Sequence, residues 1–293
     1  MIKKLISIAL VFICLFYAGC AKNEEKPKEV FIETEIIETE IKKEVDIYKY
    51  EVYDEKLEKL LAEEVNKRAG KWQIYVKNLD KNEYATVGEG EVIAASVIKL
   101  FNMACYYDLV KKGEIENSDL NDEIVKKMIC QSSNYDSNEI VSIIGGGSFD
   151  AGAKKVTEYA KNEGYKYVRE EHKLDSFILY PGRNRVSMKD SAKLLEKIYK
   201  KECVSEEMDE KMLSFLKAQE RRNKIPAYLP EGTVTLNKTG ESSTVESDVG
   251  IVYSPACDYI IAISVMEFNG YNMQTEIAKI SKVVYDYFNT GEQ

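Results

Sequence analysis

Histidine is almost missing from this sequence of 293 residues, because His172 is its single histidine. A histidine-rich metal cage is therefore excluded, and a Ser-His-Asp triad could form only around this one residue. The six cysteines form no CxxC pair, so neither a zinc site nor a dense disulfide framework is expected. We expect a nucleophilic mechanism in this chain to use a base other than histidine.

Positive charge is also in short supply, with 41 lysines and arginines against 50 aspartates and glutamates and a net charge of -9. No block of basic residues offers a footprint for nucleic-acid phosphates, so nucleic acid is not an expected partner. With 44% apolar residues the chain can bury a sizeable core, in one large domain or in two halves that share a core.

The N-terminal segment has the pattern of an export signal, which we assign to residues 1–20. Two lysines precede an apolar run over residues 5–17, which is too short to span a bilayer. The run leads into Ala-Gly-Cys and resembles a bacterial lipoprotein cleavage box, although Tyr17 replaces the usual aliphatic residue. The resemblance implies that Cys20 becomes the lipid-modified first residue of the mature chain; ordinary secretion and an uncleaved anchor are the alternatives.

Residues 21–46 are rich in glutamate and lysine, and we interpret them as a tether between a lipid anchor and a folded domain. The expected location is the extracytoplasmic face of a bacterial cell membrane, with the acyl chains as the anchor. We expect the domain that follows, residues 47–293, to be a monomer.

Four cysteines remain within this domain: Cys105, Cys130, Cys203 and Cys257. We interpret them as buried thiols that behave as small apolar side chains. The alternative is a bridge between Cys105 and Cys130 in an oxidising compartment, which the sequence alone leaves open.

Apolar periodicity places strands at both ends of the domain and helices in its middle. Leucines at helical spacing predict a helix over residues 54–70, and alternating apolar residues predict a hairpin over 71–90. The segment from Ser96 to about Ala218 has helical patterns, including an expected N-cap at Ser187. Further strands and a last helix are expected at residues 233–240, 247–254, 258–268 and 273–288.

These elements predict a mixed α/β fold of the α+β type. One antiparallel sheet is built from both chain ends, the sheet lobe of residues 47–95 and 230–293, and is flanked by the terminal helices. An all-helical lobe, residues 96–229, is inserted between the two halves of the sheet.

Ser96 and Lys99 stand three residues apart where the apolar helical segment begins. This spacing places both side chains on one helix face, and the helix start offers backbone N–H groups to an oxyanion. The pair can therefore serve as nucleophile and base. A lysine base at neutral pH needs its pKa lowered by about 3 units through burial and a neighbouring cation, so a second lysine is expected nearby.

Two further polar motifs follow along the chain. Ser132 and Asn134, in the sequence Ser-Ser-Asn, offer a hydroxyl to shuttle a proton and an amide to orient a substrate carbonyl. Lys238, Thr239 and Gly240 lie where a predicted strand runs into a turn. There lysine and threonine can bind a carboxylate, and glycine lets a substrate approach the strand. Each motif alone is common, because capping serines and solvated lysines are ordinary features.

The order SxxK, SxN and KTG is far more specific than any one motif, and it is typical of class A β-lactamases and penicillin-binding proteins. Residues 54–290 resemble the class A-like serine hydrolases of this superfamily, including the segments AASVIKLFNMA and MICQSSNYDSN. The resemblance implies Ser96 as the acylated nucleophile, Lys99 as its base and Ser132 as the proton relay to the leaving nitrogen.

The same resemblance implies the substrate contacts. Asn134 would contact the substrate amide, and Lys238 with Thr239 would bind a substrate carboxylate. The backbone N–H groups of Ser96 and Glu241 would form the oxyanion hole. No metal or organic cofactor is implied.

One departure from the family pattern bears on turnover. In class A enzymes a loop glutamate activates the deacylating water, and the most natural alignment places Ile178 at that position. Glu170, Glu171 and Asp175 lie nearby in the sequence and are the alternative acids.

A second departure bears on substrate binding. Glu246 stands where many such enzymes place a carboxylate-binding arginine. Lys224 resembles an alternative arginine site and could compensate as a substrate ligand; a solvated loop charge is its other interpretation.

We therefore expect an active-site-serine hydrolase or acyltransferase that opens β-lactam or D-alanyl-D-alanine-like amides through an acyl-Ser96 intermediate. Deacylation is expected to be slow if the loop acid is absent. The alternatives are a penicillin-binding or D,D-carboxypeptidase-like enzyme of the cell wall, and a β-lactam or peptidoglycan sensor that stays acylated. A non-enzymatic binding module on the same fold is a further alternative.

Overall fold

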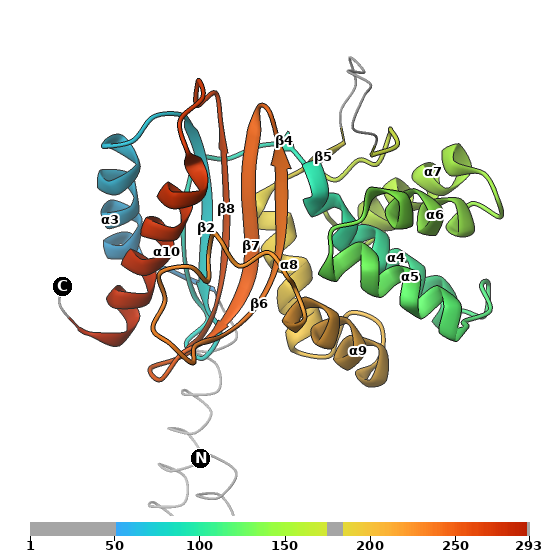
Figure 1. The fold of residues 1–293 in the computed structure, drawn as a ribbon. Coiled ribbons are helices and arrows are strands. Elements are labelled where there is room, and N and C mark those ends of the chain that lie inside the picture. The colour runs from blue at the N-terminus through green and yellow to red at the C-terminus, as the bar shows by residue number, and fades with distance from the viewer. Residues whose placement is uncertain (1–50, 175–183, 292–293) are drawn as a thin grey trace, which may run out of the picture. The chain divides into compact units, whose positions relative to one another are not determined.

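Strands from both ends of the chain form one six-stranded sheet in the computed structural model, which describes residues 51–174 and 184–291 (Figure 1). The strand order is β1-β3-β2-β8-β7-β6, and all neighbours run antiparallel except β1 and β3. The predicted mixed α/β fold is thus confirmed. The strands are β1 (Val52–Tyr53), β2 (Lys71–Asn78), β3 (Glu83–Val87), β6 (Val234–Ser242), β7 (Val245–Tyr253) and β8 (Asp258–Met266).

Helices cover both faces of this sheet, with α3 and α10 on one side and the helices of the middle segment on the other (Figure 1). Several helices of the middle segment begin at a serine N-cap, including the predicted cap at Ser187, whose Oγ accepts the Asp190 N–H at 3.0 Å. The helices are α3 (Glu55–Asn66), α4 (Lys99–Lys111), α5 (Asp119–Cys130), α6 (Asn134–Ile144), α7 (Phe149–Asn162), α8 (Met188–Tyr199), α9 (Glu206–Lys217) and α10 (Met273–Asn289).

The terminal helices bury the face of β2 that carries its apolar side chains. Trp72, Ile74 and Val76 pack with leucines of α3 and isoleucines of α10 in one buried cluster. The two helices are also joined directly, because the Tyr287 hydroxyl donates to the Asp54 carboxylate at 3.0 Å. The alternation of apolar residues that predicts the hairpin therefore arises from the packing of one face of β2 against α3 and α10.

The opposite face of β2 is buried too, although its polar residues suggest exposure. The Gln73 side-chain oxygen accepts the Met188 N–H at 2.7 Å, at the start of α8. Lys77 lies 2.7 Å from both Glu51 and Glu196, so its charge is paired where α8 covers it. Polar partners on α8 thus allow a polar strand face to be buried.

A second, two-stranded sheet joins the lobes near the motif residues. It pairs β4 (Val92–Ile93) with β5 (Arg185–Val186), just before the segment that carries Ser96. Neither strand is expected from the sequence, because a two-residue strand has no readable periodicity.

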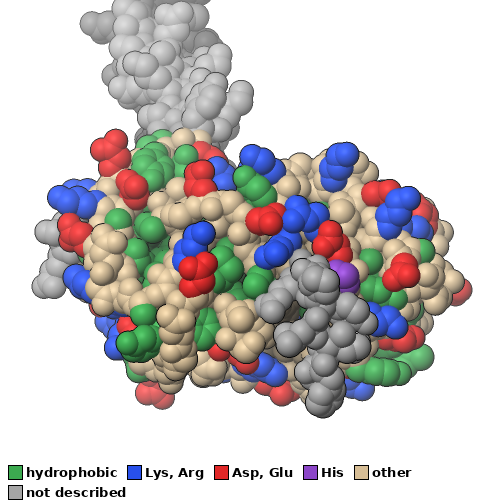
Figure 2. All heavy atoms as spheres, turned by 90° about the horizontal axis from the view of Figure 1, so that it is seen from above, with side chains coloured by type: hydrophobic (Ala, Val, Ile, Leu, Met, Phe, Trp, Pro, Cys, Tyr) green, Lys and Arg blue, Asp and Glu red, His purple; other side chains and the backbone are tan. Residues whose placement is uncertain are grey.

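Several predictions concern residues that lie outside the described ones: the lipidated Cys20, the tether of residues 21–46, and the loop positions Asp175 and Ile178. They stay predictions. None of the helices in residues 51–174 and 184–291 combines the length and apolar character that a membrane span needs. Figure 2 shows basic and acidic side chains interspersed over the viewed face.

The four cysteines of the domain are free thiols. Cys105, Cys130 and Cys257 are buried, and Cys203 is partly exposed. The alternative of a bridge between Cys105 and Cys130 is therefore not what the structure shows.

Gly152 marks the closest approach of α7 to α6, since a Cβ there would stand 1.7 Å from the Val141 carbonyl oxygen. We expect Gly152→Ala to lower the free energy of unfolding by about 2–3 kcal/mol, because the helices must move apart. Urea unfolding measures the change. Lys154→Ala, on the same helix with a side chain 78% exposed, is the control and should stay within about 0.5 kcal/mol. An unchanged midpoint in Gly152→Ala would contradict this packing.

Candidate active site

Ser96 lies in a 3-10 turn, η1 (Ala95–Ile98), and the α-helix begins only at Lys99. The sequence predicts Ser96 at the start of the helix itself, so this detail is wrong. The turn contains a positive φ of 42° at Ala95, which costs a residue with a Cβ about 1–3 kcal/mol. The predicted pairing still holds in space, because Lys99 Nζ lies 3.0 Å from Ser96 Oγ.

Lys99 is fully buried, and its side-chain nitrogen has three close partners. Nζ lies 2.6 Å from the Ser132 carbonyl oxygen and 2.8 Å from Asn134 Oδ1, besides the contact with Ser96. Burial, together with the charge of Arg221, lowers the pKa of Lys99 to about 7. A neutral amine keeps two N–H groups for Ser132 and Asn134, and its lone pair can then accept the Ser96 hydroxyl proton.

The Ser132 hydroxyl lies between two buried lysines. Its Oγ is 2.8 Å from Lys238 Nζ and 3.4 Å from Lys99 Nζ. Burial, and next the nearby Lys99, lower the pKa of Lys238 well below its usual value. Lys238 also donates to the Thr239 carbonyl oxygen at 2.8 Å, which holds the amine in place. Ser132 is therefore positioned to exchange a proton with a lysine.

β6 is the edge strand of the sheet, and it runs beside η1. A Cβ on Gly240 would lie 3.0 Å from Val97 Cγ2 and 3.2 Å from the Ala94 carbonyl oxygen, so glycine permits this approach. Thr239 is buried, and its hydroxyl has no hydrogen-bond partner within the described residues. The edge strand that contacts η1 thus carries a hydroxyl without a hydrogen-bond partner among the described residues.

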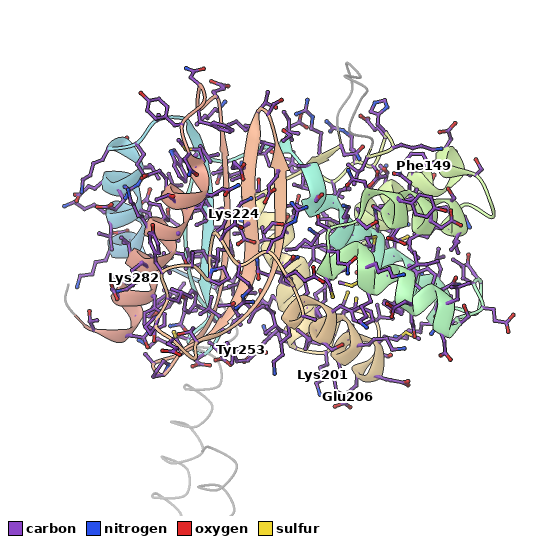
Figure 3. The ribbon with its side chains drawn as sticks, viewed as in Figure 1. Phe149, Lys201, Glu206, Lys224, Tyr253 and Lys282 are labelled. Carbon is purple, nitrogen blue, oxygen red and sulfur yellow. The ribbon has the colours of Figure 1, made fainter. Side chains whose placement is uncertain are left out.

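Lys224, predicted from the sequence as a ligand of a substrate carboxylate, is fully buried against β6 and β7 (Figure 3). Its Nζ lies 2.6 Å from Glu246 Oε2 and 3.2 Å from Glu241 Oε1. It also donates to the carbonyl oxygens of Gly240 at 3.1 Å and Ser247 at 3.0 Å. These contacts are those of an internal counter-ion, and the role as substrate ligand stays a prediction.

Glu170, one of the alternative acids in the sequence, is buried behind Lys99. Its Oε1 accepts from Asn184 Nδ2 at 2.7 Å, and the amide of Asn102 lies beside the same carboxyl group. Burial raises the pKa of Glu170 to about 8. The carboxyl group is therefore mainly protonated at pH 7, and a protonated acid cannot accept a proton from water.

Leu174 passes beside the same network at the end of the described loop segment. Its backbone N–H donates to Asn138 Oδ1 at 2.9 Å, and Asn138 lies one turn after Asn134 on α6. This bond ties the loop to the helix that carries Asn134, a partner of Lys99. The sequence alignment points to Ile178 instead, which lies outside the described residues.

Sequence reasoning missed Asn102 and Asn184. Asn102 follows Lys99 by one turn on α4, so its spacing already indicated a polar neighbour of the lysine. Asn184 gave no such signal, because it belongs to a separate segment that only the fold brings to Glu170.

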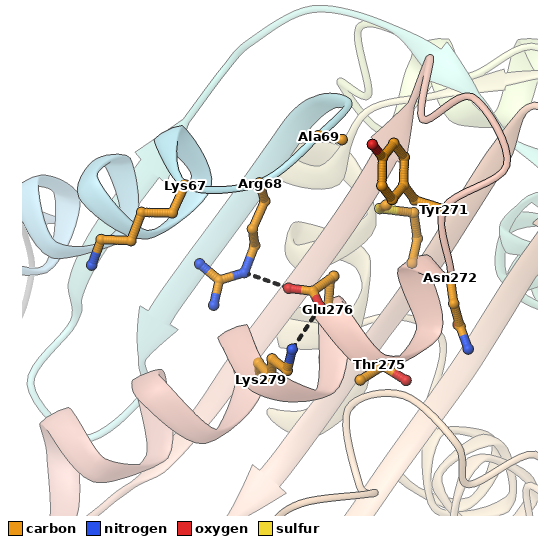
Figure 4. Close-up of a pocket in the computed structure, with 9 residues that line it drawn as sticks. Lys67, Arg68, Ala69, Tyr271, Asn272, Thr275, Glu276 and Lys279 are labelled. Atoms are coloured by element: carbon orange, nitrogen blue, oxygen red, sulfur yellow. Dashed lines mark hydrogen bonds and ion pairs between the residues drawn. The ribbon is translucent and has the colours of Figure 1, made fainter.

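A cavity of about 610 Å³ opens elsewhere, between the end of α3 and the start of α10 (Figure 4). Arg68 lies 2.9 Å from Glu276, and Lys279 lies 2.7 Å from the same carboxylate. The cations that line the cavity are thus paired within the protein, and its lining includes none of the three motifs.

The raised pKa of Glu170 predicts how stability depends on pH. The unfolded chain releases this proton near pH 4.3, whereas the folded chain keeps it up to about pH 8, so stability falls across that interval. Glu170→Gln removes this loss. We expect its thermal midpoint to exceed that of the unmodified chain at pH 8, with no advantage below about pH 4.5.

Circular dichroism melts between pH 4 and 9 measure this difference. Glu171→Gln, with a side chain 44% exposed, is the matched control and should show no such pH dependence. A lower midpoint for Glu170→Gln at pH 8 would show that Glu170 is held as a carboxylate.

A sequence model described as the beta-lactamase enzyme family matches residues 55–122 and 120–288. No curated protein matches this sequence. A solved structure of a PBP-A mutant, an acyl-enzyme complex with penicillin G, is similar with a TM-score of 0.73 and 23% identity, covering 82% of this chain and 98% of that one.

Two β-lactamases are also similar in structure. The TLA-1 extended-spectrum β-lactamase has a TM-score of 0.69 and 21% identity, with 79% of this chain and 97% of that chain covered. A β-lactamase from Sphaerobacter thermophilus has a TM-score of 0.70 and 19% identity, with 78% and 97% covered. The family match runs from the start of α3 into α10 and includes all three motifs. The chain therefore belongs to the beta-lactamase enzyme family.

Proposed function

We propose that this protein is an active-site-serine hydrolase or acyltransferase that opens β-lactam or D-alanyl-D-alanine-like amides through an acyl-Ser96 intermediate. The observation that carries the proposal is the 3.0 Å contact between Ser96 Oγ and Nζ of Lys99, whose pKa is lowered to about 7. Such a lysine is about half deprotonated at pH 7 and can act as a base near neutral pH. The family match and the PBP-A complex with penicillin G support the proposal.

In acylation, neutral Lys99 accepts the hydroxyl proton of Ser96, and Ser96 Oγ forms a bond to the substrate carbonyl carbon. The carbon–nitrogen bond then breaks, and the leaving nitrogen takes the Ser132 hydroxyl proton. The Lys99 ammonium, 3.4 Å away, replaces that proton. Lys238, at 2.8 Å, stabilises the negative charge that develops on Ser132 Oγ. One proton has then moved from Ser96 to the leaving nitrogen, and Lys99 is neutral again.

The substrate lies along the edge of β6 in this proposal. Asn134 Oδ1 accepts from Lys99, so its amide N–H groups remain for a substrate carbonyl. The Thr239 hydroxyl faces the other end of the substrate, and the backbone N–H groups of Ser96 and Glu241 bind the oxyanion.

A protein that stays acylated, as a sensor or a very slow hydrolase, is the second candidate. Leu174 favours it, because its backbone N–H binds Asn138, one turn from Asn134, while its apolar side chain packs against the core and offers no base there. The buried carboxyl of Glu170 is mainly protonated at pH 7 and is a poor base for the deacylating water. A D,D-carboxypeptidase differs only in the amide that it opens, and release of D-alanine from a peptide would identify it.

The nucleophile is tested by Ser96→Ala. We expect this variant to lose all covalent labelling by benzylpenicillin, measured by intact-protein mass spectrometry, because no Oγ remains to form the ester. Its thermal midpoint should change little, since η1 has no side-chain cap hydrogen bond to lose. Ser133→Ala, in the second motif, is the control and should still be labelled. Labelling of Ser96→Ala would remove Ser96 from the reaction.

Leu174→Glu tests the origin of slow deacylation. The new carboxylate would lie on the loop beside the lysine network and could accept a proton from water, which is worth about 10²- to 10⁴-fold. We expect the acyl-enzyme of this variant to decay faster, with an unchanged rate of acylation, in time-resolved mass spectra. Leu174→Gln adds a similar side chain without a base and should decay like the unmodified chain. Equal decay of Leu174→Glu and Leu174→Gln would show that the loop is not where the water is activated.

A further inference from the structure

The β6–β7 pair gathers carboxylates on the sheet face that carries Thr239. Residues two apart on a strand share a face, and so do residues directly opposite each other. Thr239 lies opposite Asp248, and Glu241 lies opposite Glu246. The unused Thr239 hydroxyl is therefore on the same face as these three acidic side chains.

Two cations, Lys224 and Arg221, pair with two of these acids. Lys224 Nζ lies 2.6 Å from Glu246 and 3.2 Å from Glu241, and Lys224 has no exposed surface. Arg221 Nη1 lies 2.7 Å from the other oxygen of Glu241. Asp248 is buried and accepts from Asn237 Nδ2 and from the Ile225 N–H, both at 3.0 Å. Three carboxyl groups thus share two cations: Lys224 is enclosed by its acidic partners, whereas Arg221 is 44% exposed and is paired with Glu241 through one nitrogen.

A substrate carboxylate that approached Thr239 would meet unfavourable charge. The Glu241 side chain is 27% exposed, so part of its negative charge faces the solvent at the end of the edge strand. Like charges at such short range repel, and paired cations attract a third charge only weakly. An uncharged or cationic group meets no such penalty there.

We infer that the end of the site beside Thr239 reacts with acyl donors whose leaving-group side is uncharged or cationic at least as readily as with donors that carry a carboxylate there, and that Glu246 sets this preference by pairing with Lys224. The inference rests on the proposed function and names the substrate class of the same site. Glu246 acts on specificity through Lys224 and is not part of the reaction at Ser96.

The test compares benzylpenicillin with its methyl ester, which lacks the negative charge. Second-order rates of Ser96 acylation are measured on the full chain by intact-protein mass spectrometry. We expect the unmodified protein to react with the ester at least as fast as with the acid. In Glu246→Gln, Lys224 loses its shorter ion pair and keeps only the one with Glu241 at 3.2 Å, so the ratio of acid to ester rates should rise by about tenfold. A change in the reactivity of Lys99 would alter the rates with the acid and with the ester equally, so it cancels in the ratio of the two rates.

Glu231→Gln is the matched control, because it removes the same charge from an exposed position in the segment before β6 and should leave the ratio unchanged. Glu241→Gln removes one ion pair from Lys224 and one from Arg221, so it should also raise the ratio of acid to ester rates. This variant replaces Glu246→Gln in the test if Glu246→Gln fails to fold. A strong preference for the acid in the unmodified chain, or an unchanged ratio in both variants, would overturn the inference alone. No labelling by either compound would overturn the proposed function and this inference with it.

Discussion

Removal of the Lys99 amine from water is the constraint on which the rest of the site depends. Lowering its pKa from 10.5 to about 7 corresponds to about 4–5 kcal/mol of lost charge stabilisation, which the packing of the fold must offset. α4 supplies much of that packing, since it is buried along most of its length. The Ser132 carbonyl and the Asn134 amide oxygen then hold the amine at the nucleophile, because a buried polar group needs partners.

The same desolvation acts in opposite ways on the two groups that flank the nucleophile. Burial deprives Lys99 of its proton and makes it a base, and burial leaves Glu170 with its proton and makes it a poor one. A neutral amine and a neutral carboxyl group carry the same total charge as an ion pair, but they avoid two buried charges. In the proposed reaction, burial of Lys99 and Glu170 therefore favours acylation, whereas a deacylating water needs a base from another segment.

The parts of the fold that could be predicted are those with a readable short-range pattern. Alternation in β2 and the β-branched and apolar residues of β6, β7 and β8 predict the sheet, and the spacing of Ser96 and Lys99 predicts their contact. The turn at Ala95 could not be predicted, because its positive φ has no sequence signal in an alanine. Burial of Lys77 and the contact between Glu170 and Asn184 depend on segments far apart in the chain, and no local pattern reports them.

Specificity and reaction are controlled here by different kinds of structure. The groups of the proposed reaction meet at the junction of η1, the loop before α6 and the edge strand β6, so a change in any of them alters the chemistry directly. The charge beside Thr239 is instead set by strand register, which places Glu246 opposite Glu241 and Asp248 opposite Thr239. A side chain of opposite charge at one of these positions would change which substrate charge is favoured beside Thr239. It would not move Ser96, because the hydrogen bonds of the sheet hold the backbone of β6 and β7 in place whichever side chain stands there.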